Sequence, residues 1–380
     1  MSKKITLLNQ VTGPLFIDIA NKYAEIYDEV ILVTGVIEPT YATLDDKVKI
    51  VYKTTYKRNK SYLRILTWLF FFIQTYFYFL FKKQENGEEV LIVSNPPILP
   101  FLGSVLFFKR KIKFKVLIYD VYPDALLNFG YLKKTSYIYK FWDKMNKKAY
   151  MYADEIITIS SVMKKVITRN VESSKIKIIY PWVDTSLIKP IKNDDNWFIE
   201  ENNISEKKII LYSGNMGLTH DLMTPLKVAK ELSETHPDFH FLFIGDGAQK
   251  KKLMTYVEKN MLNNVTFLNY QQSNVLPYSF ASADFAIVSL SSGAEGLSVP
   301  SKTFYSLAAG SAIIAISEKG SEIEQLISKN DCGISIQPNE VSIMRDFLTN
   351  TSDLDLEQKK KNSRILSNQF TVANVKYFLK

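Results

Sequence analysis

Short apolar runs alternate with stretches of helical periodicity along the whole chain. In the first half these runs are rich in β-branched residues and lie at 5–9, 30–34, 48–52, 90–94, 115–120, 156–160 and 176–180. In the second half they lie at 208–213, 239–245, 265–268, 285–290, 311–316 and 333–336. Strands that alternate with helices favour a parallel sheet with helices on both faces. The pattern therefore predicts an α/β protein with two such sheets.

The length and a break in this pattern predict the domain organisation. At 380 residues the chain exceeds the size that one core usually reaches, which favours two domains of roughly 180 to 190 residues. Residues 185–204 lose periodicity and gain Asn, Asp and Pro, as is typical of a linker. We therefore expect a first domain at 1–184, a linker at 185–204, a second domain at 205–360 and a helix at 361–380 that packs back towards the first domain.

Residues 65–81 form an unusual stretch, rich in Phe and Tyr, in which no residue is charged. A membrane span, a buried helix and a helix lying in the lipid interface are the alternatives. A span would place the strands at 5–9 and 90–94 on opposite sides of a membrane and so split one sheet. A buried helix must account for apolar residues around its full circumference. We favour the interfacial helix.

The distribution of charge supports a membrane partner. Residues 1–184 contain 28 Lys and Arg against 17 Asp and Glu (+11), whereas the remainder contains 20 against 22 (−2). Aromatic and basic residues also mix at 101–115 and 129–150, a pattern that could suit nucleic acid. Without an RNA or DNA module, and beside an apolar helix, a membrane is the better partner. The residues expected to face the membrane or an acceptor are Gly13, Pro14, Trp68, Phe72, Lys82, Lys83, Lys109 and Arg110.

The N-terminal sequence and the cysteine content favour a cytoplasmic protein. The start, Met1 to Lys4, and the short apolar run after it do not make a secretory signal. Cys332 is the single cysteine, so the chain has neither an internal disulfide nor a thiolate cluster for a metal. A reducing compartment is the simplest location.

Three loops in the second half predict a phosphate site. Gly214 and Gly217 follow one strand, and Gly245-Asp246-Gly247 ends the next. Glycine lets the backbone approach a ligand, and free N–H groups at a helix start attract anions. The third loop leads into a predicted helix at 302–309, whose first turn carries Lys302. A cation there opposes the helix dipole unless an anion lies between them. The alternative is a solvated lysine at an ordinary helix start.

Motifs in both halves resemble those of a known family. In the second half they are Tyr212-Ser-Gly-Asn-Met-Gly217, Phe243-Ile-Gly-Asp-Gly247, Ser282-Ala-Asp-Phe-Ala-Ile-Val288 and Glu295-Gly-Leu-Ser-Val-Pro-Ser-Lys-Thr303. Their order and spacing resemble the signatures of GT-B glycosyltransferases of family 4. In the first half, Asp120-Val-Tyr-Pro-Asp124 and Ser94-Asn-Pro-Pro97 are similar to elements of bacterial surface-polysaccharide members. The donor loop Pro300-Ser-Lys302 is similar to that of a sub-branch.

The resemblance implies two Rossmann-like, doubly wound domains that face each other across a cleft. It also implies a nucleotide sugar in the second domain, an acceptor in the first, retention of anomeric configuration, and neither a metal nor another cofactor. The residues that we expect to bind the donor are Gly214, Asn215, Gly217, His220, Gly245, Asp246, Gly247, Ser298, Ser301, Lys302, Thr303 and Tyr305. Asn215 and His220 are departures, because members of the family often carry an Arg and a Lys after the Gly214 strand.

Four residues are candidates for catalysis. Lys302 and nearby amides would stabilise the departing diphosphate, and Glu295 would orient sugar hydroxyls. Asp120 or Asp124 would hold the acceptor hydroxyl or help to remove its proton; the alternative for Asp120 is a turn cap. The chain departs from the family's usual Glu-x7-Glu pattern, because Tyr305 stands at the second position and Glu295 lies too far upstream.

We therefore expect a glycosyltransferase, peripheral on the inner face of the cytoplasmic membrane. It would move a hexose or N-acetylhexosamine from a UDP-sugar to a polyprenyl-diphosphate-linked saccharide. Capsule, exopolysaccharide or O-antigen synthesis would be its setting, with glycosyltransferase subunits as partners and no nucleic acid. Two alternatives stay open: a nucleotide-sugar epimerase of the same fold, and a catalytically silent partner subunit.

Overall fold

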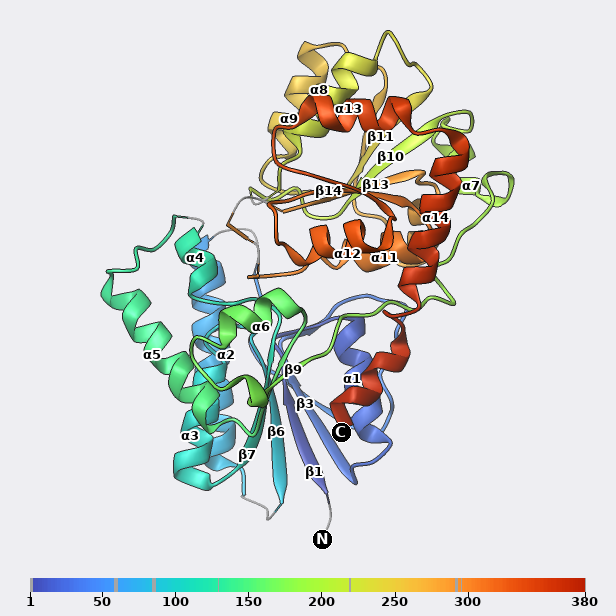
Figure 1. The fold of residues 1–380 in the computed structure, drawn as a ribbon. Helices are drawn as coiled ribbons and strands as arrows, with labels where there is room; N and C mark the ends of the chain where they lie inside the picture. The colour runs from blue at the N-terminus through green and yellow to red at the C-terminus, as the bar shows by residue number, and fades with distance from the viewer. Residues whose placement is uncertain are drawn as a thin grey trace. The chain divides into compact units, whose positions relative to one another are not determined.

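The chain forms two compact units in the structure, a computed structural model (Figure 1). It describes residues 3–57, 61–83, 87–128, 130–218, 220–290, 293–294 and 296–379. The first unit contains Met1–Tyr180, Gly296–Ser298 and Ala373–Lys380, and the second contains Pro181–Glu295 and Val299–Val372. The first unit thus ends slightly before residue 184, and residues 185–204 belong to the second unit.

A seven-stranded parallel sheet in the order β5-β3-β1-β6-β7-β8-β9 forms the centre of the first unit. Its strands are β1 (Lys4–Leu8), β3 (Glu29–Thr34), β5 (Val48–Tyr52), β6 (Glu88–Val93), β7 (Lys113–Ile118), β8 (Glu155–Thr158) and β9 (Ile176–Ile178). Leu7 of β1 aligns with Leu32 and Leu91 in the strands on either side. The two-residue strands β2 (Val11–Thr12) and β4 (Val36–Ile37) pair separately. The inner strands are apolar on both faces because helices cover both.

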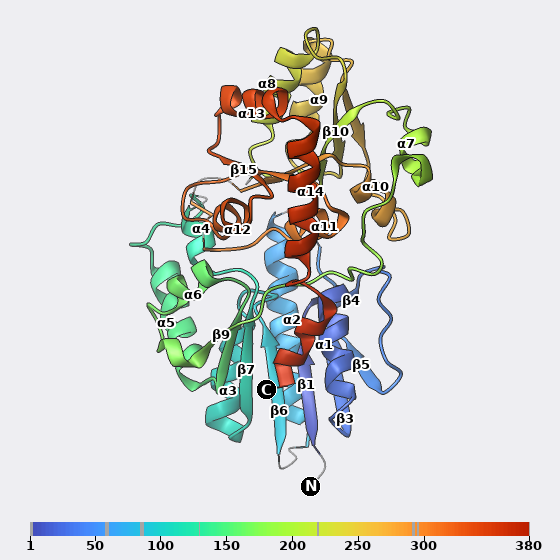
Figure 2. The same ribbon diagram turned by 45° about the vertical axis from the view of Figure 1, so that its right-hand side comes forward.

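The helices of the first unit are α1 (Pro14–Ala24), α2 (Ser61–Phe81), α3 (Pro100–Arg110), α4 (Asp124–Asn128), α5 (Tyr137–Tyr152), α6 (Ser161–Ile167) and the short η1 (Ser173–Lys175). Figures 1 and 2 show α1 and the C-terminal segment on one face of the sheet, and α2, α3 and α5 on the other. The C-terminal segment η3 (Val372–Leu379) packs on α1, where the Tyr23 hydroxyl donates to the Phe378 carbonyl over 3.1 Å.

The second unit has a six-stranded parallel sheet in the order β12-β11-β10-β13-β14-β15. Its strands are β10 (Lys208–Ser213), β11 (Phe239–Ile244), β12 (Val265–Leu268), β13 (Phe285–Ser289), β14 (Ala312–Ile316) and β15 (Gly333–Ile336). Its helices are η2 (Asn193–Asp195), α7 (Trp197–Glu201), α8 (Met223–Leu232), α9 (Lys250–Lys259), α10 (Leu276–Ala281), α11 (Lys302–Ala309), α12 (Glu322–Asn330), α13 (Val341–Asn350) and α14 (Asp353–Ser367). The α/β class with two parallel sheets is therefore confirmed.

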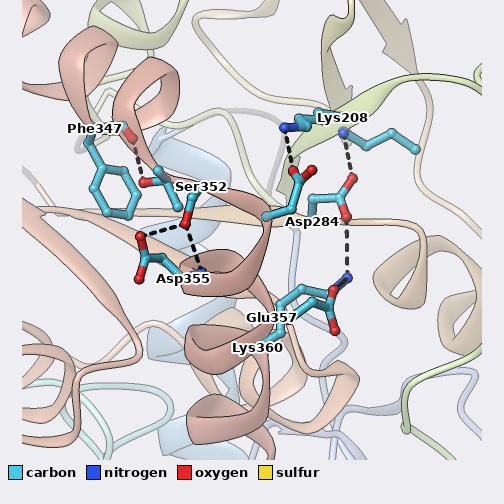
Figure 3. A network of polar contacts seen from close by, with 10 residues as sticks. Lys208, Asp284, Phe347, Ser352, Asp355, Glu357 and Lys360 are labelled. Atoms are coloured by element: carbon cyan, nitrogen blue, oxygen red, sulfur yellow. Dashed lines mark hydrogen bonds and ion pairs between the residues drawn. The ribbon is translucent and has the colours of Figure 1, made fainter.

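A polar network attaches α14 to this sheet (Figure 3). Asp284, just before β13, accepts a hydrogen bond from the Ile209 amide of β10 over 2.9 Å and pairs with Lys360 of α14 over 3.3 Å. Lys208 pairs with Asp353 in the first turn of α14 over 2.8 Å. Asp284 therefore joins two strands and a helix, which gives this motif residue a structural role.

Candidate active site

Three loops at the carboxyl edge of the second sheet surround the candidate donor site. They follow β10, follow β11, and precede α11. In open α/β sheets this edge is where ligands bind. Each loop contains residues that were expected to bind the donor.

The first two loops pack directly against each other, and this contact explains their glycines. Gly245 has a φ of +137°, and a Cβ there would lie 2.0 Å from the Gly214 carbonyl oxygen. Gly247 has a φ of +153°, and a Cβ there would lie 2.5 Å from the Met216 carbonyl carbon. The Met216 amide donates to the Asp246 carbonyl over 2.7 Å. Gly245 and Gly247 are thus required for loop packing, whether or not a ligand approaches.

Lys302, in the first turn of α11, extends its side chain into this loop pair. Its Nζ lies 3.8 Å from the centroid of the Tyr212 ring. A Cβ on Gly214 would lie 3.2 Å from Lys302 Cε and 3.3 Å from Nζ, so the glycine leaves space for the lysine. The Nζ is buried and has no hydrogen-bond partner among the described residues. A buried, unpaired ammonium is costly, and an anion beside it removes that cost.

Burial lowers the pKa of the Lys302 ammonium to about 7. The ring of Tyr212 compensates for lost water only in part, because a cation–π contact is weaker than full hydration. The ligand-free site therefore holds a cation that is close to losing its proton at neutral pH.

His220 contributes a neutral ring to the same loops. Its Nδ1 donates to the Ser289 carbonyl over 2.6 Å. Burial, and next the charge of Lys302, lower the pKa of His220 to about 4. At pH 7 the ring is therefore uncharged, with its proton on Nδ1. Any role of His220 in donor binding would have to proceed without a positive charge.

The other expected donor residues differ in how accessible they are. Ser301 is exposed at the start of α11, and Asn215 and Asp246 are exposed in the first two loops. Thr303 is fully buried, and Tyr305 stacks on Phe280 with 5.2 Å between ring centroids. These two side chains pack within the unit.

Three further expected residues differ in their surroundings, and two residues of the site were not expected. Gly217 lies close to the Asn215 side chain, since a Cβ there would lie 2.7 Å from Asn215 Nδ2, and its carbonyl accepts a hydrogen bond from Gln249 Nε2 over 2.5 Å. Ser298 belongs to the first unit, and Glu295 lies outside the described residues. The sequence interpretation missed Tyr212, which reads simply as a strand residue. It also missed Lys250, whose Nζ donates to the Gly245 carbonyl over 2.9 Å.

The two acids expected to act on the acceptor have different surroundings. Asp124 is buried, and its Oδ1 accepts from the Tyr139 hydroxyl over 3.2 Å and from Arg169 over 3.0 Å. Asp120 follows β7, is exposed, and makes no hydrogen bond within the part of the chain that the structure describes. Although Asp120 is exposed, the protein that surrounds its carboxyl group still desolvates it and raises the pKa of Asp120 to about 6. The structure thus favours a structural role for Asp124 and leaves Asp120 able to accept a proton.

Helix α2 has one buried and one exposed face. By length and composition, it is the one described helix that could cross a membrane, and 22% of its apolar window is buried. Its buried positions include Phe71, Thr75 and Phe79. At helical spacing, the exposed apolar positions are Tyr62, Ile65, Leu66, Leu69, Phe70, Ile73, Phe77, Leu80 and Phe81. Apolar residues around the circumference are thus explained by packing on one side and exposure on the other.

The expectation that Trp68 faces the membrane is wrong. Its side chain is 9% exposed, stacks on Tyr56 with 6.5 Å between centroids, and lies under the Arg64 guanidinium at 5.5 Å. Helical spacing places Trp68 on the buried face with Phe71 and Thr75. Phe72 is half-buried at the border between the two faces.

The basic residues around α2 are mostly engaged within the unit. Lys82 is paired with the buried Glu88, and Lys109 donates to the Tyr76 hydroxyl over 3.2 Å. Arg110 donates to the Leu80 and Lys82 carbonyls over 2.6 and 2.8 Å and so caps the end of α2. Lys83 is exposed. Gly13 and Pro14 start α1 as its N-cap and first residue.

Comparisons with known proteins show which proteins this chain is similar to. Residues 193–362 match the family model Glycosyl transferases group 1. The probable glycosyltransferase WbjE of Pseudomonas aeruginosa is 26% identical over 73% of this chain and 69% of its own length. The putative colanic acid biosynthesis glycosyl transferase WcaI of Escherichia coli K12 is 25% identical over 71% of this chain and 67% of its own length.

Two solved structures share the fold. Anabaena Alr3699/HepE, in complex with UDP and glucose, superposes with a TM-score of 0.75 at 15% identity, over 100% of this chain and 98% of its own. WaaG, a glycosyltransferase involved in lipopolysaccharide biosynthesis, superposes with a TM-score of 0.69 at 13% identity, over 96% of this chain and 95% of its own. The fold is therefore that of the GT-B class. With a group 1 domain at residues 193–362, the chain is a glycosyltransferase.

Proposed function

We propose that this glycosyltransferase belongs to family 4 and transfers a hexose or N-acetylhexosamine from a UDP-sugar with retention of configuration. The observation that carries the proposal is Lys302, whose buried Nζ has no hydrogen-bond partner in the described chain and lies at the start of α11. A diphosphate there would accept hydrogen bonds from the ammonium and from the Ser301 and Lys302 amides, whereas the Thr303 and Phe304 amides already donate to the Pro300 and Ser301 carbonyls. The HepE neighbour, whose complexes contain UDP and UDP-glucose, supports this choice of donor.

The proposed mechanism depends on stabilising the negative charge that develops on the leaving diphosphate. The bond between the sugar and the diphosphate breaks as negative charge collects on the leaving phosphate, and a preorganised cation lowers the energy of that state. Lys302 supplies the cation, and Glu295 orients the sugar hydroxyls. Asp120 accepts the proton of the acceptor hydroxyl, for which a pKa of about 6 is suitable near neutral pH. In this proposal neither a metal nor another cofactor takes part.

The acceptor is proposed to be a saccharide on polyprenyl diphosphate, at the inner face of the cytoplasmic membrane. The exposed apolar face of α2 and the surplus charge of +11 in residues 1–184 support a peripheral location on anionic lipid. The names of two similar proteins refer to colanic acid and lipopolysaccharide biosynthesis. We propose capsule, exopolysaccharide or O-antigen assembly as the setting, with other glycosyltransferase subunits as partners.

The test has two stages. Calorimetry with UDP-, GDP- and dTDP-sugars should show binding of a UDP-sugar, and the same donor should label lipid extracted from bacterial membranes. Lys302→Ala should abolish transfer while thermal unfolding stays cooperative. Lys329→Ala, which removes an exposed lysine of α12, should leave transfer unchanged. Unchanged turnover in Lys302→Ala, or binding without transfer to any membrane lipid, would overturn the proposal.

A further inference from the structure

A groove of about 920 Å³ lies in the first unit between the end of β5 and α2. Four aromatic residues and two lysines line it: Tyr52, Phe77, Tyr78, Phe81, Lys53 and Lys82. It lies at the edge strand of the sheet, whereas Asp120 follows the inner strand β7. The groove is therefore a separate site from the one that contains Asp120.

Side-chain hydrogen bonds between α2 and the segment after β5 hold the two walls of the groove in place. Gln74 Oε1 of α2 accepts hydrogen bonds from the Thr54 amide over 2.8 Å and from the Thr54 hydroxyl over 2.9 Å. Gln10 Nε2 donates to the Thr54 carbonyl over 3.1 Å and to the Thr67 carbonyl over 3.0 Å. The segment after β5 is thus fixed to α2, so the groove exists without a ligand.

The groove carries a net positive charge. Lys53 and Lys82 both lie near the Tyr78 ring, with 5.4 and 5.7 Å between Nζ and centroid. Glu88 neutralises Lys82, but no carboxylate of the described chain pairs with Lys53. The two lysines of the lining thus face one acid, a surplus of +1, which favours an anionic ligand.

The groove opens onto the exposed apolar face of α2. Phe81 is 81% exposed and Phe77 46% exposed, and their rings stack with 6.0 Å between centroids. Both residues belong to the groove and to that face. A ligand with its anionic group on Lys53 would therefore extend its apolar part along Phe77 and Phe81, towards the surface that we propose to lie on lipid.

We propose that this groove binds the phosphate group of an anionic membrane phospholipid, with Lys53 on the phosphate and Phe77 and Phe81 against the acyl chain. The inference rests on the membrane location in the proposed function and adds a saturable lipid site to it. Lys53 is the residue that we expect to contact the phosphate, because the other lysine of the groove, Lys82, is paired with Glu88.

The test uses the full chain and short-chain lipid below its micelle concentration. Dihexanoyl phosphatidylglycerol should bind with saturation, and dihexanoyl phosphatidylcholine should not. Lys53→Ala should weaken phosphatidylglycerol binding by about tenfold, the size of a charge-assisted contact. The matched control is Lys57→Ala, which removes an exposed lysine four residues along the same segment and outside the groove lining. It should leave binding of the monomeric lipid unchanged.

Other outcomes would overturn the inference. Equal losses in the Lys53 and Lys57 variants would indicate a diffuse electrostatic surface, which is worth about fivefold per lysine on vesicles. Equal binding of phosphatidylcholine, or displacement by inorganic phosphate at the lipid's own concentration, would exclude a phospholipid site. Thermal unfolding of each variant checks the fold. UDP-sugar titration of the same protein separates the two proposals, since a failed groove with intact donor binding leaves the glycosyltransferase proposal unaffected.

Discussion

In the proposed donor site, the buried ammonium of Lys302 should make donor binding depend on pH in a definite direction. Its pKa is lowered to about 7 in the ligand-free protein. An adjacent diphosphate favours the charged form, so the pKa rises again in the complex. Binding above pH 7 must therefore take up a proton, and the affinity falls as the protonated fraction of free protein falls.

The magnitude follows from that fraction. With a pKa of about 7, roughly one tenth of the free protein is protonated at pH 8 and about one hundredth at pH 9. We therefore expect the Kd of a UDP-sugar to be about tenfold larger at pH 8 than at pH 6, and about a hundredfold larger at pH 9. His220, with its pKa lowered to about 4, does not titrate in this range.

Isothermal titration calorimetry in two buffers of different ionisation enthalpy measures both the affinity and the proton uptake. Lys302→Met should bind weakly with a flat pH profile, because it keeps the volume and removes the titrating group. The ligand-free Lys302→Met protein should also be more stable to heat at pH 7 than the natural one, since the cost of a buried charge disappears. A flat profile in the natural protein between pH 6 and 9, or an unchanged slope in Lys302→Met, would refute this reasoning.

Two further predictions concern the loops and the acids. Gly245→Ala should lower the free energy of unfolding by more than about 2 kcal/mol and abolish donor binding, because the new Cβ would overlap the Gly214 carbonyl. Gly320 also has a positive φ but lies in open space, so Gly320→Ala should lower the free energy of unfolding by only about 1 kcal/mol. Equal urea midpoints for the two variants would contradict the packing argument. Asp120→Asn should lower the transfer rate by about a hundredfold and remove the rise in rate near pH 6, with folding intact. Asp124→Asn should instead lower the melting temperature, because the contact with Arg169 is lost. A slow but stable Asp124→Asn protein together with an active but less stable Asp120→Asn protein would show that the two roles are exchanged.

The sequence located Lys302 and the glycine loops because both signals are local. A cation in the first turn of a helix and a glycine directly after a strand each indicate an anion site from only a few neighbouring residues. The partner of Lys302 could not be found this way. Tyr212 lies 90 positions away and meets the lysine only because β10 lies next to β13, whose loop leads into α11.

The same limit applies to residues whose surroundings the sequence alone did not indicate. Asp124 and Arg169 are 45 residues apart, so their contact depends on the fold bringing the start of α4 close to the segment that follows α6. In α2, apolar residues occupy every side, and periodicity alone cannot select the face that meets the sheet. Trp68 was therefore assigned to the membrane on composition, whereas the fold buries it. The neutrality of His220 depends on burial, which follows only from the assembled loops.

The exposed face of α2 has a practical consequence for the purified protein. Nine large apolar side chains along one helix form a continuous surface of the kind that soluble monomers rarely present. In buffer without lipid or detergent, two or more copies can cover these side chains by placing α2 against α2. We expect the apparent size of the particle to grow with concentration and to fall to that of a single chain when short-chain lipid is added, so a dimer seen in plain buffer would reflect the missing bilayer rather than a native assembly.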